Sequence, residues 1–425
     1  MDLPALPARS GAPTAGEDAL ASAAQLRDGL GRLRRDALKL ALEDEQRGRE
    51  RLAASLAELR GNLRVLCRVR PPLALEDTGD SSPSGPAVVA TETDVTLFAE
   101  VAPLVQAAAD GHHACVFAYG QTGAGKSHTL AGDIDAQEED QYGIYARAAS
   151  LLFEVAAERA QVSDWRVALQ MVEVYNDEIY DLLGDRVSVL HDPTGSAASS
   201  PSTPVGNGIH AGATGLMGPS QLAASSSPPV GEIRHGDRGI FLKNVATVTV
   251  TTAAQVTAAI TRGASATDRA NRAHSVVLLH VTSVSKFDGS KRAGRLALVD
   301  LAGSERLAKT DSFATSAAAQ REAQHINKSL AAVGDVMAAV LAREKHVPYR
   351  NSKLTHLLQD SLGGPNNHAL LLVHVSPARA DAAETINSLK FAARVSRTPS
   401  SGRDQRAEIS KLHGVVRSLS VDPAA

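Results

Sequence analysis

A glycine-rich stretch at residues 120–127, GQTGAGKS, has the residue types and spacing of a phosphate-binding loop. In such a loop the glycines let consecutive backbone N–H groups converge on phosphate oxygens. Lys126 would reach the β- and γ-phosphates of a nucleotide, and the hydroxyl of Ser127 would ligate Mg²⁺. The alternative interpretation is a glycine-rich surface turn. The candidate nucleotide-binding residues of this stretch are Gly120, Gln121, Thr122, Gly123, Ala124, Gly125, Lys126 and Ser127.

Two predicted strands would position this chemistry, and they favour the phosphate loop over the surface turn. The apolar run HACVFAYG, residues 113–120, predicts a buried strand that leads into the loop, and a helix is expected to open at residues 125–127. A second buried strand, RLALVD, ends at Asp300, which can hold a Mg²⁺-bound water as a Walker-B carboxylate does. Gly303 follows closely and lets a backbone N–H approach a γ-phosphate, so that this loop could sense the phosphate. Together these residues predict a nucleoside triphosphatase.

The overall composition excludes several other classes of protein. A formal net charge of −3 over 425 residues, with 21% charged residues, excludes a generally basic nucleic-acid binder. Cys67 and Cys115 lie in apolar, strand-like runs, which suits a reducing compartment better than a disulfide framework. No stretch approaches the roughly 20 apolar residues that cross a bilayer, and the N-terminus lacks an apolar signal region. The sequence therefore predicts a soluble, intracellular protein without nucleic-acid binding or membrane insertion.

Changes in composition divide the chain into regions. Residues 1–17 are rich in Pro, Ala and Gly and are predicted to be disordered, and residues 397–425 are predicted to be a flexible tail. Residues 63–396 alternate between strand and helix patterns, as in an α/β sandwich. Within them, residues 185–231 are a predicted disordered insert of Ser, Pro, Gly and Ala.

Residues 18–62 contain no proline and carry leucines and alanines at helical spacing. The spacing alternates between three and four residues, but its phase slips once, and charged residues then fall on the apolar seam. The pattern favours a marginal coiled coil that joins two chains. A single amphipathic helix packed on its own domain is the alternative.

Seven sequence blocks, in the expected order, closely resemble the motor domain of kinesins. The resemblance implies a P-loop NTPase of kinesin type, with a central, mostly parallel sheet flanked by helices on both faces and preceded by a helical coiled-coil neck. It also implies ATP and Mg²⁺ as cofactors, microtubule-stimulated ATP hydrolysis, and a place in the cytoplasm on microtubules of the cytoskeleton or spindle. The blocks are GNLRVLCRVRP (61–71), FAYGQTGAGKSHT (117–129), EVYNDEIYDLL (173–183), LVDLAGSER (298–306), EAQHINKSL (322–330), HVPYRNSKLTHLLQDSLGG (346–364) and ETINSLKFAARV (384–395).

The order of the segments is similar to that of the C-terminal-motor kinesins, which move towards microtubule minus ends. The predicted neck helix precedes the motor-like region, and LAELRGNLRVLCRVRP looks like the neck and first strand of that subfamily. After FAARV the sequence does not resemble the neck linker of plus-end motors. The resemblance thus implies a minus-end-directed motor.

The resemblance also assigns roles to further residues. Arg68 and Pro71 match the contacts on the adenine side of the nucleotide, with His128 near the same base. Asp300, Gly303 and Glu305 match the second switch loop, and Glu305 would form an ion pair with the first-switch arginine, here Arg272. Such a charge-assisted bond, made in one nucleotide state and broken in another, turns a local event into a mechanical one. The implied catalytic residues are Lys126, Arg272, Asp300, Gly303 and Glu305.

Four cations are implied to face the acidic surface of tubulin. They lie in the predicted helix INKSLAAVGDVMAAVLA, residues 326–342, and in the loop and HVPYRNSKLTHLL segment that follow it. Binding through such charges would be sensitive to salt. The alternative is an ordinary solvated face. The residues are Lys328, Lys345, Arg350 and Lys353.

The first switch departs from the family pattern N-x-x-S-S-R-S-H. Aligned on Arg272 and His274, this chain has Ala270 and Asn271 where the family has its two adjacent serines. The second serine normally supplies a hydroxyl to Mg²⁺, for which the amide of Asn271 is a weak substitute because Mg²⁺ demands near-ideal octahedral geometry. Phosphoryl transfer depends mainly on positioning, so these changes predict slower hydrolysis with nucleotide binding retained. The segment before the switch also looks shortened.

A second departure lies between the RVRPP segment and the next helix. An aromatic-rich strand block of the family is replaced there by residues 73–98, which predicts that part of the sheet edge is missing. Three functions therefore remain open at this stage. They are a motile microtubule-dependent ATPase, a nucleotide-gated microtubule binder that does not move, and an inactive partner subunit of a heterodimeric motor.

Overall fold

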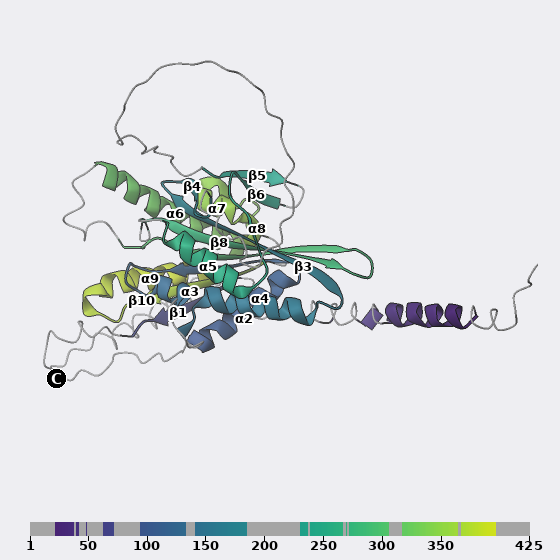
Figure 1. Ribbon diagram of the computed structural model, residues 1–425. Coiled ribbons are helices and arrows are strands. Elements are labelled where there is room, and N and C mark those ends of the chain that lie inside the picture. Colours follow the sequence, from purple (N-terminus) through teal and green to yellow (C-terminus); the bar gives the residue numbers. More distant parts are fainter. Residues whose placement is uncertain are drawn as a thin grey trace, which may run out of the picture.

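The computed structural model describes most of the motor-like region and part of the N-terminal helix (Figure 1). The predicted disordered N-terminus, nearly all of the predicted insert, the C-terminal tail and residues 270–271 lie outside the described residues. The described residues are 22–37, 40–41, 48, 63–71, 94–132, 141–184, 230–236, 239–266, 269, 272–305, 317–363 and 367–396.

A single large sheet forms the centre of the fold. Its strand order is β1-β10-β2-β9-β8-β3-β4, and the short strand β7 also pairs with β3. A separate two-stranded sheet consists of β5 and β6. The strands are β1 (Leu63–Val69), β2 (His113–Tyr119), β3 (Ser163–Tyr175), β4 (Glu178–Asp181), β5 (Glu232–Gly236), β6 (Gly239–Lys243), β7 (Val248–Val250), β8 (His274–Ser285), β9 (Lys291–Asp300) and β10 (His368–Val375).

The prediction of a mostly parallel sheet is correct for only one half. The pairs β1–β10, β10–β2 and β2–β9 are parallel, whereas β9–β8, β8–β3, β3–β4 and β3–β7 are antiparallel. Chain connections explain the difference. Residues 286–290 join β8 to β9 and residues 176–177 join β3 to β4, and such short links produce antiparallel neighbours, whereas parallel pairs need long crossovers. The resulting sheet is mixed, with its parallel half at the phosphate loop.

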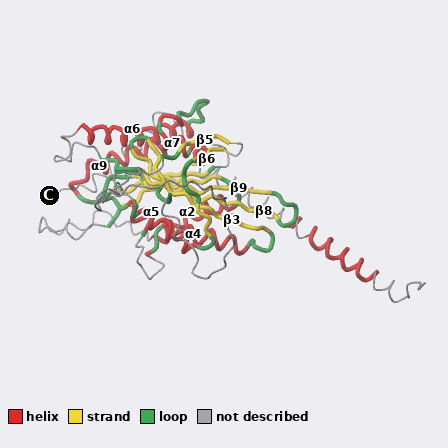
Figure 2. The backbone as a smooth tube through the Cα atoms, turned by 45° about the horizontal axis from the view of Figure 1, so that its top comes forward, coloured by secondary structure: helices red, strands yellow, loops and turns green. Residues whose placement is uncertain are grey.

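Helices cover both faces of the sheet, as the sequence predicted (Figure 2). One face carries α2, α3, α4 and α5, and the other carries α6, α7, α8 and α9. The helices are α2 (Asp94–Ala109), α3 (Lys126–Ala131), α4 (Ile144–Glu158), α5 (Ala253–Ala264), α6 (Ala317–Leu341), α7 (Lys353–Leu357), α8 (Gln359–Leu362) and α9 (Ala382–Ser396), with 3-10 turns η4 (Tyr349–Asn351) and η5 (Arg379–Asp381).

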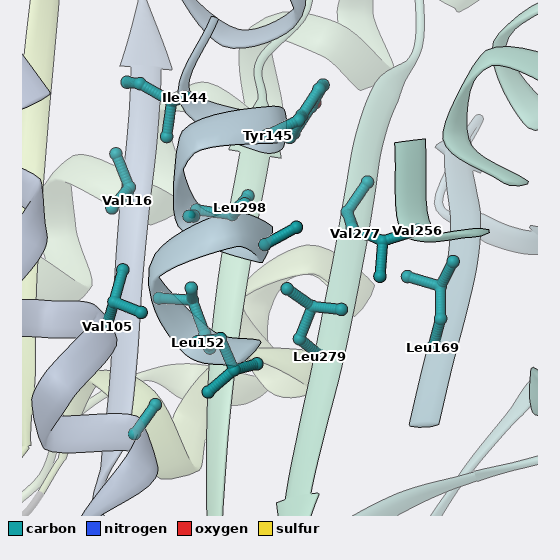
Figure 3. Packing of buried hydrophobic residues seen from close by; sticks show 14 of the residues in the cluster. Val105, Val116, Ile144, Tyr145, Leu152, Leu169, Val256, Val277, Leu279 and Leu298 are labelled. Carbon is teal, nitrogen blue, oxygen red and sulfur yellow. The ribbon is translucent and has the colours of Figure 1, made fainter. Parts of the chain in front are cut away.

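Alternation along the central strands builds two cores. On β2, Val116 packs towards α2 and α4, while its neighbour Phe117 packs towards α6 and α9. Successive strand residues point to opposite faces, so a strand covered on both sides reads as an uninterrupted apolar run. Figure 3 shows the first core, where Leu152 of α4 lies over Leu298 and Leu279 of neighbouring strands. Burial on both faces therefore fixes the end of β2, from which the phosphate loop begins.

The small β5–β6 hairpin is attached to the second face through Ile240, whose backbone contacts both members of the Arg295–Asp360 ion pair. The backbone N–H of Ile240 donates to Asp360 Oδ2 at 2.6 Å, and the guanidinium of Arg295, only 2% exposed, lies 3.6 Å from the same carboxylate. The last two residues of the predicted insert belong to the fold. Val230 bridges to Tyr180 of β4, and the Gly231 N–H donates to Ile179 O at 2.7 Å.

The predicted neck segment is helical where the structure describes it, over residues 22–37. Leu26, Leu30, Leu33 and Leu40 are 60 to 70% exposed in the single chain. The coiled coil itself stays a prediction. Within the described ranges, no helix combines the length and the apolar composition needed to cross a membrane.

Candidate nucleotide site

The phosphate loop follows β2 and opens α3, in the order that the sequence predicted. Three of its glycines have positive φ angles, of 150° at Gly120, 81° at Gly123 and 94° at Gly125. A Cβ atom at Gly120 would lie 2.3 Å from the carbonyl oxygen of His374 on β10. The turn therefore needs glycine for its backbone conformation and, at Gly120, for a close approach to the neighbouring strand.

Lys126 lies inside this loop. Its Nζ donates to the carbonyl oxygens of Gly120 at 2.9 Å and Gln121 at 3.0 Å, and the residue is only 9% exposed. Burial lowers the pKa of the ammonium group, while the carboxylates of Asp300 and Glu305 act in the opposite direction. The loop thus holds a cation at its centre.

Ser127 and Asp300 meet at the open side of the loop. Ser127 Oγ donates to Asp300 Oδ2 at 2.6 Å, and the other oxygen, Oδ1, is buried without a hydrogen-bond partner among the described residues. Burial raises the pKa of Asp300, and the Ser127 hydrogen bond and Lys126 oppose that effect. A hydroxyl next to a carboxylate with a free acceptor suits Mg²⁺, which prefers oxygen ligands and retains waters. The weak third candidate, Asn271, lies outside the described residues.

The second switch loop contacts the phosphate loop through Glu305. Its carboxylate accepts the backbone N–H of Thr122 at 2.8 Å and the Thr122 hydroxyl at 2.5 Å. A Cβ at Gly303 would lie 2.3 Å from both Glu305 oxygens, so only glycine leaves room for this contact.

The predicted ion pair between Arg272 and Glu305 is absent between these two described residues. Arg272 Nη1 instead lies 3.6 Å from Glu322 Oε2 on α6, while Glu305 is held by Thr122. The physical reason is competition. Each charged group has another partner close by, and a carboxylate that accepts a backbone N–H and a hydroxyl is already well satisfied.

His274, at the start of β8, ties the two switches to α6. The N–H of Ala302 donates to His274 Nδ1 at 3.0 Å, so the ring proton is on Nε2, which donates to Ser329 Oγ at 2.7 Å. Ser329 in turn donates to Ile326 O at 2.8 Å. Burial, with a smaller contribution from Lys126, lowers the pKa of His274 to about 3, so the ring is neutral. The family pattern marked this histidine, but its partners could not be predicted from the sequence.

The predicted adenine-side residues are found at the end of β1. Arg68 donates to the hydroxyl of Thr129 on α3, which also lies 2.8 Å from His374 Nε2. Pro71 and His128 are exposed near the loop. Sequence reasoning missed Arg70, whose guanidinium donates to Gly123 O at 2.9 Å and Ser376 Oγ at 3.0 Å. The signal was available, because Arg70 directly follows β1, two residues after Arg68, and alternate residues of an extended chain point the same way.

The four cations predicted to face tubulin are all exposed. Lys328 is on α6, Lys345 in the following loop, Arg350 in η4 and Lys353 at the start of α7. Their exposure is compatible with a docking surface and with an ordinary solvated face alike.

The loop, the carboxylate at the end of the neighbouring parallel strand and the two switch segments define a P-loop nucleoside triphosphatase. Residues 87–398 match the kinesin motor domain family. The chain belongs to the kinesin family, as the seven sequence blocks indicated.

Two plant relatives illustrate this kinship. Kinesin-like protein KIN-14M of Oryza sativa subsp. japonica is 38% identical over 378 residues, covering 81% of this chain and 29% of the relative. Kinesin-like protein KIN-14P of Arabidopsis thaliana is 34% identical, covering 85% of this chain and 35% of the relative. The chain thus spans about a third of the length of the curated relatives it matches.

Solved structures support the same family. The C-terminal motor and motor homology domain of Kar3Vik1, fused to a synthetic heterodimeric coiled coil, is 28% identical with a TM-score of 0.66, covering 90% of this chain and 98% of that chain. The motor domain of the kinesin-like protein KAR3 of Saccharomyces cerevisiae is 29% identical with a TM-score of 0.58, covering 79% and 100%.

Proposed function

We propose that this chain is a microtubule-stimulated ATPase and a minus-end-directed motor of cytoplasmic microtubules, which binds ATP and Mg²⁺. The observation that carries the proposal is the convergence of Lys126, Ser127, Asp300 and Glu305 on one glycine-rich loop. Relatives with KIN-14 and Kar3 names support the direction of movement, because the sequence order resembles that of the C-terminal-motor kinesins.

The residues of the loop have distinct roles in this proposal. Lys126 would exchange its two carbonyl partners for phosphate oxygens, which a buried ammonium binds more strongly. Ser127 and Asp300 would hold Mg²⁺, which when bound neutralises charge on the phosphates. Arg68 and Arg70 brace the loop and α3 from the end of β1.

Glu305 gives the site two arrangements. A phosphate in the loop and the Glu305 carboxylate are both anionic acceptors, and they compete for the N–H of Thr122. Nucleotide binding is therefore expected to displace Glu305, and Arg272 is the cation that the family pattern places to receive it. The exchange of one partner for another is a bistable element of the kind that converts ligand binding into movement.

Helix α6 would carry this change to the microtubule. Adjacent residues of a helix lie about 100° apart around its axis, and here Lys328 is exposed while Ser329 is buried against His274. The second switch contacts His274 through Ala302, and His274 contacts α6 through Ser329. A shift of the second switch would thus displace α6 and its exposed face.

Phosphate release by the full chain, with and without microtubules, tests the proposal together with co-pelleting in ATP and in ADP. Strong stimulation of phosphate release by microtubules is expected. Pelleting that depends on the nucleotide without turnover would instead establish a non-motile, nucleotide-gated binder. Turnover only in a mixture with an intact motor chain would establish a partner subunit.

Restoring the serines of the first switch is expected to accelerate hydrolysis. Asn271→Ser should raise the rate of phosphate release about tenfold, because a hydroxyl meets the geometry of Mg²⁺ better than an amide, and Ala270→Ser beside it should add to the gain. Single-turnover phosphate release measures the effect. An unchanged rate in both variants would show that the length of the switch segment limits hydrolysis.

The exposed leucines of residues 22–37 are expected to join two chains. Each side chain would bury apolar surface against a partner helix, with a gain of about 1.5 to 3 kcal/mol when buried fully. Sedimentation velocity should therefore give a dimer for the natural chain and a monomer for the double variant Leu30→Asp/Leu33→Asp. A natural chain that sediments as a monomer at micromolar concentration would contradict this prediction.

A further inference from the structure

The segment that leads into the first switch carries an arginine, Arg269, that lies against two tyrosine rings. Its Cζ atom is 4.5 Å from the ring centroid of Tyr175 and 5.1 Å from that of Tyr180. Tyr175 ends β3 and Tyr180 lies in β4, and the two rings are 6.5 Å apart with an interplanar angle of 56°. Both distances fall within the roughly 6 Å over which a cation is attracted to an aromatic face. The guanidinium of Arg269 thus contacts both aromatic rings.

A buried carboxylate completes the contact. Arg269 Nη1 is 3.5 Å from Glu173 Oε2, and the Glu173 side chain is only 4% exposed, whereas that of Arg269 is 41% exposed. A carboxylate removed from water is unfavourable unless a cation or hydrogen-bond donors compensate its charge. The planar guanidinium can stack on aromatic faces and contact a carboxylate together, which a lysine ammonium does less well. Glu173 and Tyr175 of β3 and Tyr180 of β4 therefore form a binding surface that suits arginine, and we call these three residues the seat.

The backbone of Arg269 connects this seat to the first switch. The N–H of Arg272 donates to Arg269 O at 2.8 Å, which closes a turn from position 269 to 272. Beyond the turn, Arg272 lies near Glu322 on α6, and His274 accepts the N–H of Ala302. The described residues on either side of positions 270 and 271, where the family pattern has its two serines, are thus each held by contacts with other elements.

We propose that Arg269 is a positioning residue, whose seat on Tyr175, Tyr180 and Glu173 holds the first switch against the antiparallel half of the sheet. This inference rests on the proposed nucleotide function. In the family pattern, two serines at positions 270 and 271 would contact the nucleotide and its metal. Ala270 and Asn271 replace them here, so contacts within the protein, made by the seat, take over the role of holding the switch. Loss of the seat removes the contact that holds the backbone leading to Arg272 and His274, and shortens the time for which nucleotide stays bound.

The test compares Arg269→Ala with Arg262→Ala in the full chain. Arg262 lies in the last turn of α5, a few residues upstream, and its Nε donates only within its own helix, to Ala258 O at 3.3 Å. The first readout is hydrogen exchange of the amides of residues 272–276 without nucleotide. The second is the release rate of a fluorescent ADP analogue. Both should rise about tenfold in Arg269→Ala and stay unchanged in Arg262→Ala.

Further variants separate the seat from a general loss of stability. Tyr180→Phe keeps the aromatic face, loses only a hydrogen bond to exposed Glu178 on the same strand, and should behave as the natural chain, while Tyr180→Leu should resemble Arg269→Ala. Arg269→Lys should give a partial effect of about threefold, because it keeps the charge and loses the planar fork. The double variant Arg269→Ala/Tyr180→Leu should be no worse than either single variant, since both remove one shared contact.

The two readouts separate this inference from the proposed function. Unchanged exchange at residues 272–276 in Arg269→Ala, or an equal rise throughout the sheet, would overturn the proposed seat. If exchange rises locally but the natural chain does not bind the ADP analogue, the seat stands and the nucleotide function is wrong.

Discussion

Replacing Lys126 with alanine is expected to weaken nucleotide binding about a thousandfold. The ammonium group is buried at the centre of the phosphate loop, where it now donates to two carbonyl oxygens. With a triphosphate in the loop it would make two charge-assisted hydrogen bonds, each about 1.5 to 3 kcal/mol. Losing both corresponds to about 3 to 6 kcal/mol, which is roughly two to four orders of magnitude in affinity. Titration with a fluorescent ATP analogue measures the change.

Lys291→Ala is the matched control for this variant. Lys291 is exposed at the start of β9, at the opposite end of the strand from Asp300, and its loss should leave nucleotide affinity unchanged. Unfolding in denaturant shows whether the loop tolerates alanine, since Gly120 O and Gln121 O lose a donor. Affinity retained in a folded Lys126→Ala protein would mean that the phosphate-loop assignment is wrong.

Lowering the pH from 7 to 5 is expected to reduce the free energy of unfolding by about 5 to 6 kcal/mol. Burial lowers the pKa values of His274 and His374 to about 3 and that of His280 to about 4. In the unfolded chain these rings titrate near pH 6.5, so below that pH the unfolded state takes up protons that the folded state does not. Their contribution to stability is therefore present above about pH 6.5 and is lost as the pH falls towards the folded values.

Each ring accounts for roughly 2 kcal/mol of this loss at pH 5, because 1.5 pH units below the unfolded pKa correspond to about 1.36 kcal/mol per unit. The raised pKa of Asp300 acts in the opposite direction, so histidine variants give the cleaner measurement. Guanidinium unfolding at pH 7, 6 and 5 should show about a third less acid sensitivity in His280→Gln. His346→Gln, which removes an exposed ring, should match the natural chain. An unfolding free energy that is flat between pH 7 and 5 would exclude neutral, buried rings.

The candidate site was predictable where its residues are close in sequence or lie in apolar strands. The eight-residue loop, the buried strand before it and Asp300 at the end of β9 follow from spacing and hydrophobic pattern alone. Contacts between distant segments did not follow. Thr122 and Glu305 are 183 residues apart, and Thr129 and His374 are 245 apart. In both pairs, the sequence around one residue does not identify its partner.

The same limit applies to the switch residues and to the sheet. The family resemblance implied the pairing of Arg272 with Glu305 in one nucleotide state, but the contact of Arg272 with Glu322 depends on where α6 lies and could not be predicted. The apolar runs of β8 and β9 predict buried strands, yet a run covered on both faces carries no sign of its direction, so the antiparallel half was missed. The coiled coil and the roles of Ala270 and Asn271 remain predictions.

The backbone pairing of Val230 and Gly231 with β4 shows where foreign sequence can be inserted into this protein. Asp181 ends β4, and the chain returns at Val230 and Gly231, whose backbones pair with Tyr180 and Ile179 of the same strand. The pairing at β4 joins the two ends of the segment between them. It depends little on the length of that segment, because each doubling of a loop adds only about 0.6 kcal/mol of closure entropy. This junction is a natural point for accepting foreign sequence, and a reporter domain grafted there would leave the strand order and the phosphate loop as they are.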